Sequence, residues 1–193
     1  MYKLIELLPP VRRRYYRRLF ILMSWIRGAR IAVDIGCGVG LSAEIVAERV
    51  GLLYMVDKDP EALKLASARA SKMRNVELIL SRAEDLPLPD SIADLVYFHD
   101  SFDEIQEKER AISEALRVLK PEGVLAIMDW DGSNPLARLK QAILRVLGFD
   151  IEMWPLERLL EVLKSFGTEL ILFRSWVDGS FILLARKEPR RST

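Results

Sequence analysis

The chain of 193 residues is 50% hydrophobic and 30% charged, values that are ordinary for a single globular domain. One cysteine excludes a disulfide framework, and the sequence shows neither a signal peptide nor an apolar run long enough to span a bilayer, so we expect a cytoplasmic protein. Asn and Gln are scarce, with two of each, which favours a thermophilic source.

Positive charge is concentrated in the first thirty residues, which hold eight Lys and Arg against one Glu, although the whole chain has a formal charge of +1. Apolar residues recur there at helical spacing on both sides of Pro9-Pro10, so residues 1–29 are predicted to form a basic helical cap. The basic and aromatic run at 12–20 suits phosphate contacts on RNA or on anionic lipid, but it also suits a solvated helix face that covers a cofactor. We favour the solvated face because the net charge is low.

An apolar strand is predicted at residues 30–35, and it runs directly into a glycine-rich turn with glycines at 36, 38 and 40. Glycine allows positive φ and lets a ligand approach backbone amides that a Cβ would obstruct. A helix predicted over residues 41–50 would add the positive end of its dipole. These features together predict a cofactor site at the turn.

The spacing of the glycines distinguishes between two kinds of cofactor. A dinucleotide-binding turn reads Gly-x-Gly-x-x-Gly, but here the third glycine comes one residue early and Leu41 stands at the dinucleotide position. An NAD-dependent dehydrogenase is therefore disfavoured.

The second predicted strand, at residues 52–56, is followed by an acid that suits a ribose. Asp57 lies about 20 residues beyond the glycines, where a carboxylate can accept hydrogen bonds from ribose hydroxyls. Asp59 is expected instead to cap the next helix, which has Pro60 at its first position. Residues 76–80 make a third strand.

A loop rich in acids and prolines leads to a fourth strand at 93–98 and to an amphipathic helix at 107–119. Residues 120–123 are predicted to stop that helix in a turn, where Glu122 is tolerable if it keeps a negative φ. A fifth strand follows at 124–128. Short apolar strands that alternate with helices indicate right-handed crossovers and a parallel sheet covered on both faces.

The pattern changes after the fifth strand. Helices are predicted at 136–147 and 155–166, and then two strands at 169–174 and 181–186 follow each other closely through a turn at 178–180. We therefore expect an α/β fold of the doubly wound type, in which ligands bind at the carboxyl ends of the strands near the point where the strand order reverses.

Four motifs in this order resemble those of the class I S-adenosylmethionine (SAM)-dependent methyltransferases. Asp34 leads an acidic-x-Gly-x-Gly-x-Gly turn, and residues 81–90, SRAEDLPLPD, resemble the family stretch G-D-A-E-D-L-P-F-P-D. Asp94-Leu95-Val96 lies in the fourth strand, and residues 116–123, LRVLKPEG, are close to the R-V-L-K-P-G-G turn of the ubiquinone/menaquinone biosynthesis-like (methyltransferase type 11) branch.

The resemblance covers residues 30–130 well, and it implies a fold and a domain organisation. The expected fold is a Rossmann-like, doubly wound, seven-stranded and mostly parallel sheet with a C-terminal antiparallel hairpin. One methyltransferase domain is expected over residues 1–186, with a flexible tail over residues 187–193.

The resemblance also implies SAM as the cofactor and a role for each matching residue. The glycine turn faces the methionine carboxylate, Asp34 engages the ammonium group, Asp57 the ribose, and the loop at 81–90 the adenine. Arg82 stands where the family usually has an adenine-reading Asp, so either neighbours in that loop serve instead or the loop is only solvated. The predicted cofactor-binding residues are Asp34, Gly36, Cys37, Gly38, Gly40, Asp57, Lys58, Ala83, Glu84 and Phe98.

The methyl acceptor is expected at the ends of the fourth and fifth strands, beside the cap. His99, the only histidine, is a candidate general base and Asp100 a second candidate catalytic residue, although His99 also suits a local role at the end of its strand. Methyl transfer often needs only proximity and alignment. Asp100, Asp129 and Asp131 could hold Mg²⁺, but carboxylates at strand ends more often cap loops, and no metal is predicted.

The leading prediction is a SAM-dependent methyltransferase that acts without a metal on a small-molecule or lipid-like acceptor. No Asn-Pro-Pro-Tyr follows the fourth strand, which argues against transfer to a base nitrogen or a glutamine amide, and Cys37 lies inside the glycine turn, which leaves cysteine-assisted methylation unsupported. Two alternatives stay open: a SAM-dependent RNA methyltransferase that uses the basic cap, and a non-catalytic SAM-binding or regulatory module.

Overall fold

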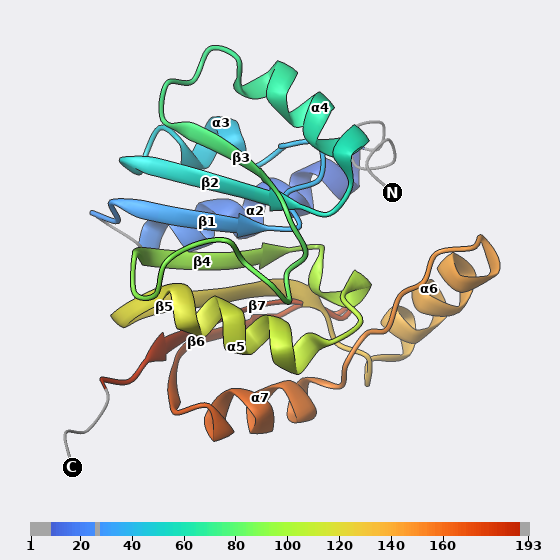
Figure 1. Cartoon of the computed structure of the whole chain (residues 1–193). Helices are drawn as coiled ribbons and strands as arrows, with labels where there is room; N and C mark the ends of the chain where they lie inside the picture. Colours follow the sequence, from blue (N-terminus) through green and yellow to red (C-terminus); the bar gives the residue numbers. More distant parts are fainter. Residues whose placement is uncertain (1–8, 26–27, 190–193) are drawn as a thin grey trace.

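The computed structural model describes residues 9–25 and 28–189, and one seven-stranded sheet runs through it (Figure 1). The strands are β1 (Ile31–Ile35), β2 (Leu52–Asp57), β3 (Val76–Leu80), β4 (Ala93–His99), β5 (Leu119–Trp130), β6 (Thr168–Ser175) and β7 (Ser180–Lys187). They are arranged in the order β3-β2-β1-β4-β5-β7-β6, and β7 runs antiparallel to both of its neighbours while the other pairs are parallel. The predicted doubly wound sheet with a C-terminal antiparallel hairpin is confirmed.

Helices cover both faces of this sheet (Figure 1). They are α2 (Pro9–Trp25), α3 (Ala43–Val46), α4 (Pro60–Ala70), α5 (Lys108–Val118), α6 (Pro135–Val146) and α7 (Leu156–Ser165), with a short 3₁₀ turn η1 (Phe102–Glu104). Helices α2, α3 and α4 contribute to one hydrophobic core, and α5 and α7 to a second core on the opposite face. Over the described ranges, no helix combines the length and the apolar character needed to cross a membrane.

The central strands β1 and β4 are buried on both sides, which explains why they read as continuous apolar runs in the sequence. The chain crosses from β1 outward to β2 and β3 and then returns to β4 on the other side of β1. The strand order therefore reverses between β1 and β4, and their carboxyl ends define the crevice where a ligand is expected.

The helix predicted over residues 41–50 is shorter than expected, because α3 includes only Ala43–Val46. The backbone here closes three-residue turns: Ala43 donates to Gly40 at 3.2 Å, and the amide of Arg49 donates to Val46 at 2.9 Å. These i to i−3 bonds wind the segment more tightly than an α-helix. A helix dipole of useful strength is consequently absent from this segment.

The turn predicted at residues 120–123 is also different, since these residues lie within β5. The pairing of β5 with β4 is irregular there, with a register shift between Ala93 and Leu95. The condition of a negative φ at Glu122 is not met, because its φ is 64°. The related family turn has a glycine where this chain has Glu122, and the glutamate accepts a left-handed conformation that costs about 1 kcal/mol.

The two ends of the domain depart slightly from their predicted boundaries. Helix α2 includes Pro9–Trp25, so both prolines lie in its first described turn, as the fixed φ of proline allows. The apolar positions predicted before Pro9 lie outside the described residues. Lys187 belongs to β7, and its Nζ donates to the carbonyls of Leu116 and Leu119 at 2.7 and 2.6 Å. The tail predicted over residues 187–193 therefore starts at least one residue later than expected. The last four residues of that tail lie outside the described part of the chain.

Candidate functional site

A pocket of about 260 Å³ opens at the carboxyl ends of β1, β2 and β4, at the point where the strand order reverses. Acidic side chains dominate the charged part of its wall. The charged lining residues are Asp57, Lys58, Asp59, Glu84, Asp100 and Glu104. Five carboxyl groups against one ammonium group favour a cationic ligand and disfavour a polyphosphate.

The glycine turn joins β1 to the pocket through backbone hydrogen bonds. The carbonyl of Val56 accepts from the amides of Gly36 and Cys37 at 2.8 and 3.0 Å, and the amide of Gly40 donates to the Cys37 carbonyl at 3.0 Å. The three glycines have φ values of 73°, 54° and 80°. Because the turn amides at 36, 37, 38 and 40 donate within the protein, they are not free donors for an anionic group; the turn instead brings the Gly36 backbone to the pocket wall.

Asp57 ends β2 beside this turn and lines the pocket. Its carboxylate accepts from the amide of Gly38 at 2.7 Å and from the amide of Asp59 at 2.9 Å. Each carboxylate oxygen has a second lone pair, so Asp57 is held rigidly and can still accept from a ligand hydroxyl. The neighbouring Asp59 accepts from the amide of Glu61 at 2.9 Å, which confirms the predicted helix cap.

The loop after β3 supplies another part of the pocket wall through Ser81, Ala83 and Glu84. Arg82 points outward, with 55% of its side chain exposed, and its guanidinium pairs with the Glu84 carboxylate at 3.2 Å. The Glu84 side chain is only 6% exposed. The arginine at the family's Asp position therefore pairs with Glu84, and Ala83 and Glu84 both line the pocket wall.

Asp34 lies beneath the glycine turn and not on the pocket wall. The hydroxyl of Ser42 donates to its carboxylate. Burial raises the pKa of Asp34 to about 7, against the opposing effect of the Ser42 hydrogen bond. Asp34 therefore stabilises the turn from below, through the segment that leads into α3.

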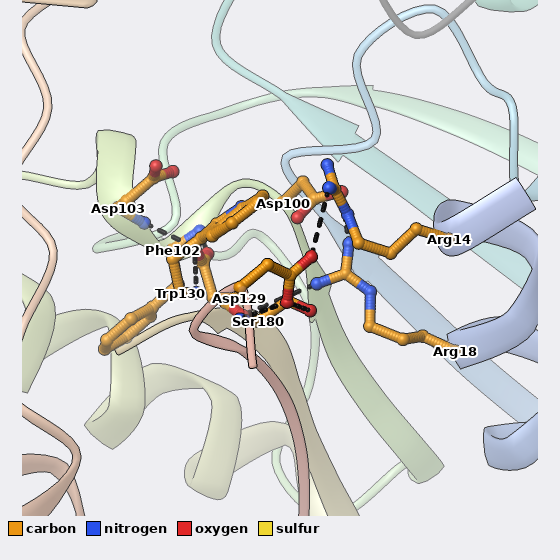
Figure 2. A network of polar contacts seen from close by, with 9 residues as sticks. Arg14, Arg18, Asp100, Phe102, Asp103, Asp129, Trp130 and Ser180 are labelled. Atoms are coloured by element: carbon orange, nitrogen blue, oxygen red, sulfur yellow. Dashed lines mark hydrogen bonds and ion pairs between the residues drawn. The ribbon is translucent and has the colours of Figure 1, made fainter. Parts of the chain in front are cut away.

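Figure 2 shows Arg14 and Arg18 reaching from α2 towards the ends of β4 and β5. Arg18 is fully buried, forms an ion pair with Asp100, and donates to the Asp129 carbonyl at 3.5 Å. Arg14 pairs with Asp178 at 3.4 Å and lies over the Trp130 ring, 4.3 Å from its centroid. The prediction of a solvated basic face is wrong for these two arginines, because they fasten α2 to the end of the sheet.

The two candidate catalytic residues lie next to each other but face different surroundings. The His99 ring stacks on Tyr15 with centroids 3.7 Å apart, and among the described residues neither of its nitrogens has a hydrogen-bond partner. Burial, reinforced by Arg18, lowers the pKa of His99 well below its usual range, so the imidazole is neutral. Asp100 lines the pocket; burial alone would raise its pKa, but Arg18, with smaller contributions from His99 and Lys140, lowers it overall.

The acids considered for Mg²⁺ have other partners. Asp129 accepts from three backbone amides, Asp131 from the Ser133 hydroxyl and backbone, and Asp100 from Arg18. Within residues 9–25 and 28–189, no group of three or more His, Cys, Asp or Glu side chains is placed to hold a metal ion.

Known proteins share both the sequence motifs and this architecture. A family model described as a methyltransferase domain matches residues 33–127. Ajmaline N-methyltransferase of Rauvolfia serpentina is 26% identical over 172 residues, which cover 81% of this chain and 59% of the relative. Ubiquinone/menaquinone biosynthesis C-methyltransferase of Hydrogenovibrio crunogenus is 28% identical over 123 residues, covering 61% and 48% of the two chains.

A solved SAM-dependent methyltransferase from Aquifex aeolicus has the same fold, with a TM-score of 0.73 and 23% identity over 96% of this chain and 97% of that chain. Residues 33–127 of the chain match the methyltransferase domain family, and the chain has the fold of a SAM-dependent methyltransferase. The cofactor of such a methyltransferase is SAM, and the acidic pocket fits its net positive charge, because the sulfonium and the amino group outnumber its single carboxylate. This methyltransferase chain spans roughly half the length of the curated relatives, 59% and 48% of the two named above.

Only some of the predicted cofactor-binding residues line the pocket. Gly36, Asp57, Lys58, Ala83 and Glu84 line it. The other predicted cofactor-binding residues are not on the wall: Asp34, Cys37, Gly38 and Gly40 form or support the turn, and Phe98 is fully buried and packs edge-on against Phe102.

Several pocket residues of the methyltransferase were missed from the sequence. Ser101 lies between β4 and η1, Glu104 ends η1, and Ile105 follows it; their position shortly after a central strand was a usable signal. Phe149 follows α6, far along the chain, and no local motif marks it. Its place on the wall depends on how the segment between β5 and β6 folds back over the strand ends.

Proposed function

We propose that this chain transfers a methyl group from SAM to a small-molecule or lipid-like acceptor without a metal ion. The observation that carries the proposal is the acidic pocket at the reversal of strand order, with Gly36, Asp57, Ala83 and Glu84 on its wall. A pocket of this charge suits a sulfonium with an amino group, and it opposes the diphosphate of a dinucleotide.

Each part of the wall has a role in this proposal. Asp57 accepts from the ribose hydroxyls, the loop around Ala83 holds the adenine, and the acids near the end of β4 attract the positive charges. When bound, SAM supplies an activated methyl group on its sulfonium. The protein contributes by fixing that group against the acceptor and by excluding water, which is sufficient for methyl transfer to a good nucleophile.

The surroundings of His99 and Asp100 favour alignment over proton transfer as the mechanism. His99 is enclosed by Tyr15 and is not on the pocket wall, so it has no direct path to an acceptor. Asp100 is on the wall, but Arg18 lowers its pKa and holds it as a carboxylate. We therefore assign Asp100 to charge placement, and we expect the acceptor to be a nucleophile that needs no strong base.

The acceptor class is supported by two observations. Among the arginines that suggested RNA binding, Arg14 and Arg18 are engaged inside the protein and Arg17 lies over Trp176 at 4.2 Å, which weakens that alternative. The named relatives are an ajmaline N-methyltransferase and a ubiquinone/menaquinone biosynthesis C-methyltransferase, whose names point to small or lipid-like acceptors.

Incubation with methyl-labelled SAM tests the proposed acceptor class. Small-molecule, lipid and RNA fractions are offered separately, each once with EDTA and once with added Mg²⁺. We expect label to enter the small-molecule or lipid fraction and S-adenosylhomocysteine to form in equal amount. Label confined to the RNA fraction would contradict the acceptor class, dependence on added Mg²⁺ would contradict the metal-free reaction, and SAM binding without transfer to any fraction would support a non-catalytic module.

A further inference from the structure

The outer edge of β6 is unpaired in the described part of the chain. Strand β6 ends the strand order, at the opposite end of the sheet from β3, and it pairs with β7 alone (Figure 1). An edge strand leaves every second backbone N–H and C=O group free to pair with another strand. Two large apolar side chains of β6 are also open to solvent, since Leu170 is 47% exposed and Phe173 is 37% exposed. This edge therefore offers both backbone and apolar contacts to a further strand.

A bulge in β6 decides which of its side chains share a face of the sheet. Consecutive residues of β7 lie opposite Leu170 and Leu172, so Ile171 is an extra residue in the strand. The alternation of side chains is consequently shifted by one position after Ile171. One face of the sheet carries Glu169, Leu172 and Arg174, and the opposite face carries Leu170 and Phe173.

The two charged residues of β6 have opposite signs and lie on the same face. Glu169 and Arg174 are both exposed, and neither forms an ion pair with any residue in the ranges 9–25 and 28–189. Arg186 lies opposite Glu169 on β7, but its guanidinium pairs with the carboxylate of Glu122 at 3.9 Å. Both charges of the edge strand are therefore available to a group from outside the domain.

This strand is complementary to itself in one antiparallel register. When two copies of β6 pair about a two-fold axis through Leu172, Glu169 of each copy lies opposite Arg174 of the other. In the same register Leu170 lies opposite Phe173, and the axis generates every contact twice. Both copies carry the same extra residue, so the register is equal on the two sides of the axis. An axis through Leu170 or Phe173 instead would separate the opposite charges.

The other edge of the sheet lacks this match. Strand β3 contains one charged residue, Glu77. Pairing of β3 with a second β3 therefore brings no opposite charges together. Of the two edges, only that of β6 selects a second copy of the chain by its charges.

We propose that two copies of the chain pair antiparallel through β6 and join their sheets into one. This pairing does not rest on the proposed function, because it needs neither SAM nor an acceptor. Strands β5 and β7 separate the pairing edge from the strands that carry the pocket. One strand from each copy makes a small interface, so we expect a weak dimer whose population rises with protein concentration.

Sedimentation equilibrium of the full chain at several concentrations and at low salt tests the pairing by charge reversal. Glu169→Arg places two arginines opposite each other at both ends of the paired strands, and Arg174→Glu places two glutamates there. We expect each single reversal to weaken the dimer at least about tenfold. The double reversal Glu169→Arg/Arg174→Glu restores opposite charges and should restore the dimer.

An equimolar mixture of the two single variants is the sharpest form of the test. Each arginine of one copy then meets a glutamate of the other, so the mixture should dimerise although neither variant does so alone. Glu77→Arg and Arg74→Glu are the controls, because they reverse exposed charges on or just before β3, and both should dimerise as the unaltered chain does.

Circular dichroism of each variant first establishes that it is folded. The proposal is overturned if the unaltered chain stays monomeric at every concentration, or if the folded single variants dimerise as strongly as the unaltered chain, which would place the interface elsewhere. A mixture of the two single variants that stays monomeric would also overturn it.

Discussion

Gly36→Ala is expected to destabilise the fold by about 2–5 kcal/mol and to remove most of the affinity for SAM. A Cβ at this position would lie 2.5 Å from the Cβ of Ser101 and 2.9 Å from its hydroxyl, and the backbone has a φ of 73°. Because Ser101 follows β4 and lines the pocket, relief of the collision must move the pocket wall. Urea unfolding and SAM titration measure the two effects.

Gly167→Ala separates the collision from the cost of the backbone conformation. Gly167 has a φ of 70°, almost that of Gly36, but an added Cβ would meet nothing within 4 Å. We expect about 1–2 kcal/mol of destabilisation and unchanged SAM affinity for this control. Addition of Ser101→Gly to Gly36→Ala should restore part of both losses. Equal effects of the two alanine substitutions on SAM binding would show that the contact between Gly36 and Ser101 does not shape the pocket.

Arg18→Met is expected to cost about 3–5 kcal/mol of unfolding free energy at pH 8, because it leaves Asp100 buried without its partner. The Arg18 side chain is fully buried and that of Asp100 is 11% exposed. Adding Asp100→Asn should recover much of the loss, since no buried charge then remains. Arg12→Met is the control: Arg12 is exposed on the same helix, and its loss should change stability by less than about 0.5 kcal/mol.

The change of the unfolding free energy of Arg18→Met with pH gives a sharper test than the size of its destabilisation at pH 8. In the unaltered chain the lowered pKa of Asp100 stabilises the fold at pH values above the unfolded value near 4, and this contribution is lost as the pH falls through the lower folded pKa. Without Arg18, burial raises the folded pKa above the unfolded one, so the variant should regain stability as the pH falls from 8 towards 4. Urea unfolding at several pH values should show this reversal; the same pH slope in both proteins would remove Arg18 as the cause of the lowered pKa.

The fold was predictable from the sequence because its signals are local and repeated. Each buried strand reads as an apolar run, and Asp59 with Pro60 marks the start of α4 as predicted. The prediction failed where long-range contacts decide the backbone. The segment over residues 41–50 was expected to be a helix, but only Ala43–Val46 form one, with turns on both sides, while Ser42 reaches back to Asp34.

The sequence predicted the residues of the candidate site that belong to motifs, but it did not predict the residues that surround them. Gly36 and Asp57 were identified because their positions relative to β1 and β2 follow from the motif. Two features had no local signal: burial of Arg18 against Asp100, which joins residues 82 positions apart, and the approach of Phe149 to the pocket. An arginine-rich helix reads as a solvated face until the acid that it meets is known.

The central claim, that the acidic pocket holds SAM with Asp57 as its ribose acceptor, is tested most directly by titration calorimetry with SAM. Asp57→Ala is compared with Asp59→Ser, which alters the next acid along the pocket wall but retains a side chain able to cap α4. We predict one SAM bound per chain, an affinity weakened about tenfold to a hundredfold by Asp57→Ala, and little change with Asp59→Ser. No binding to the unaltered chain, or unchanged affinity in Asp57→Ala, would contradict the account.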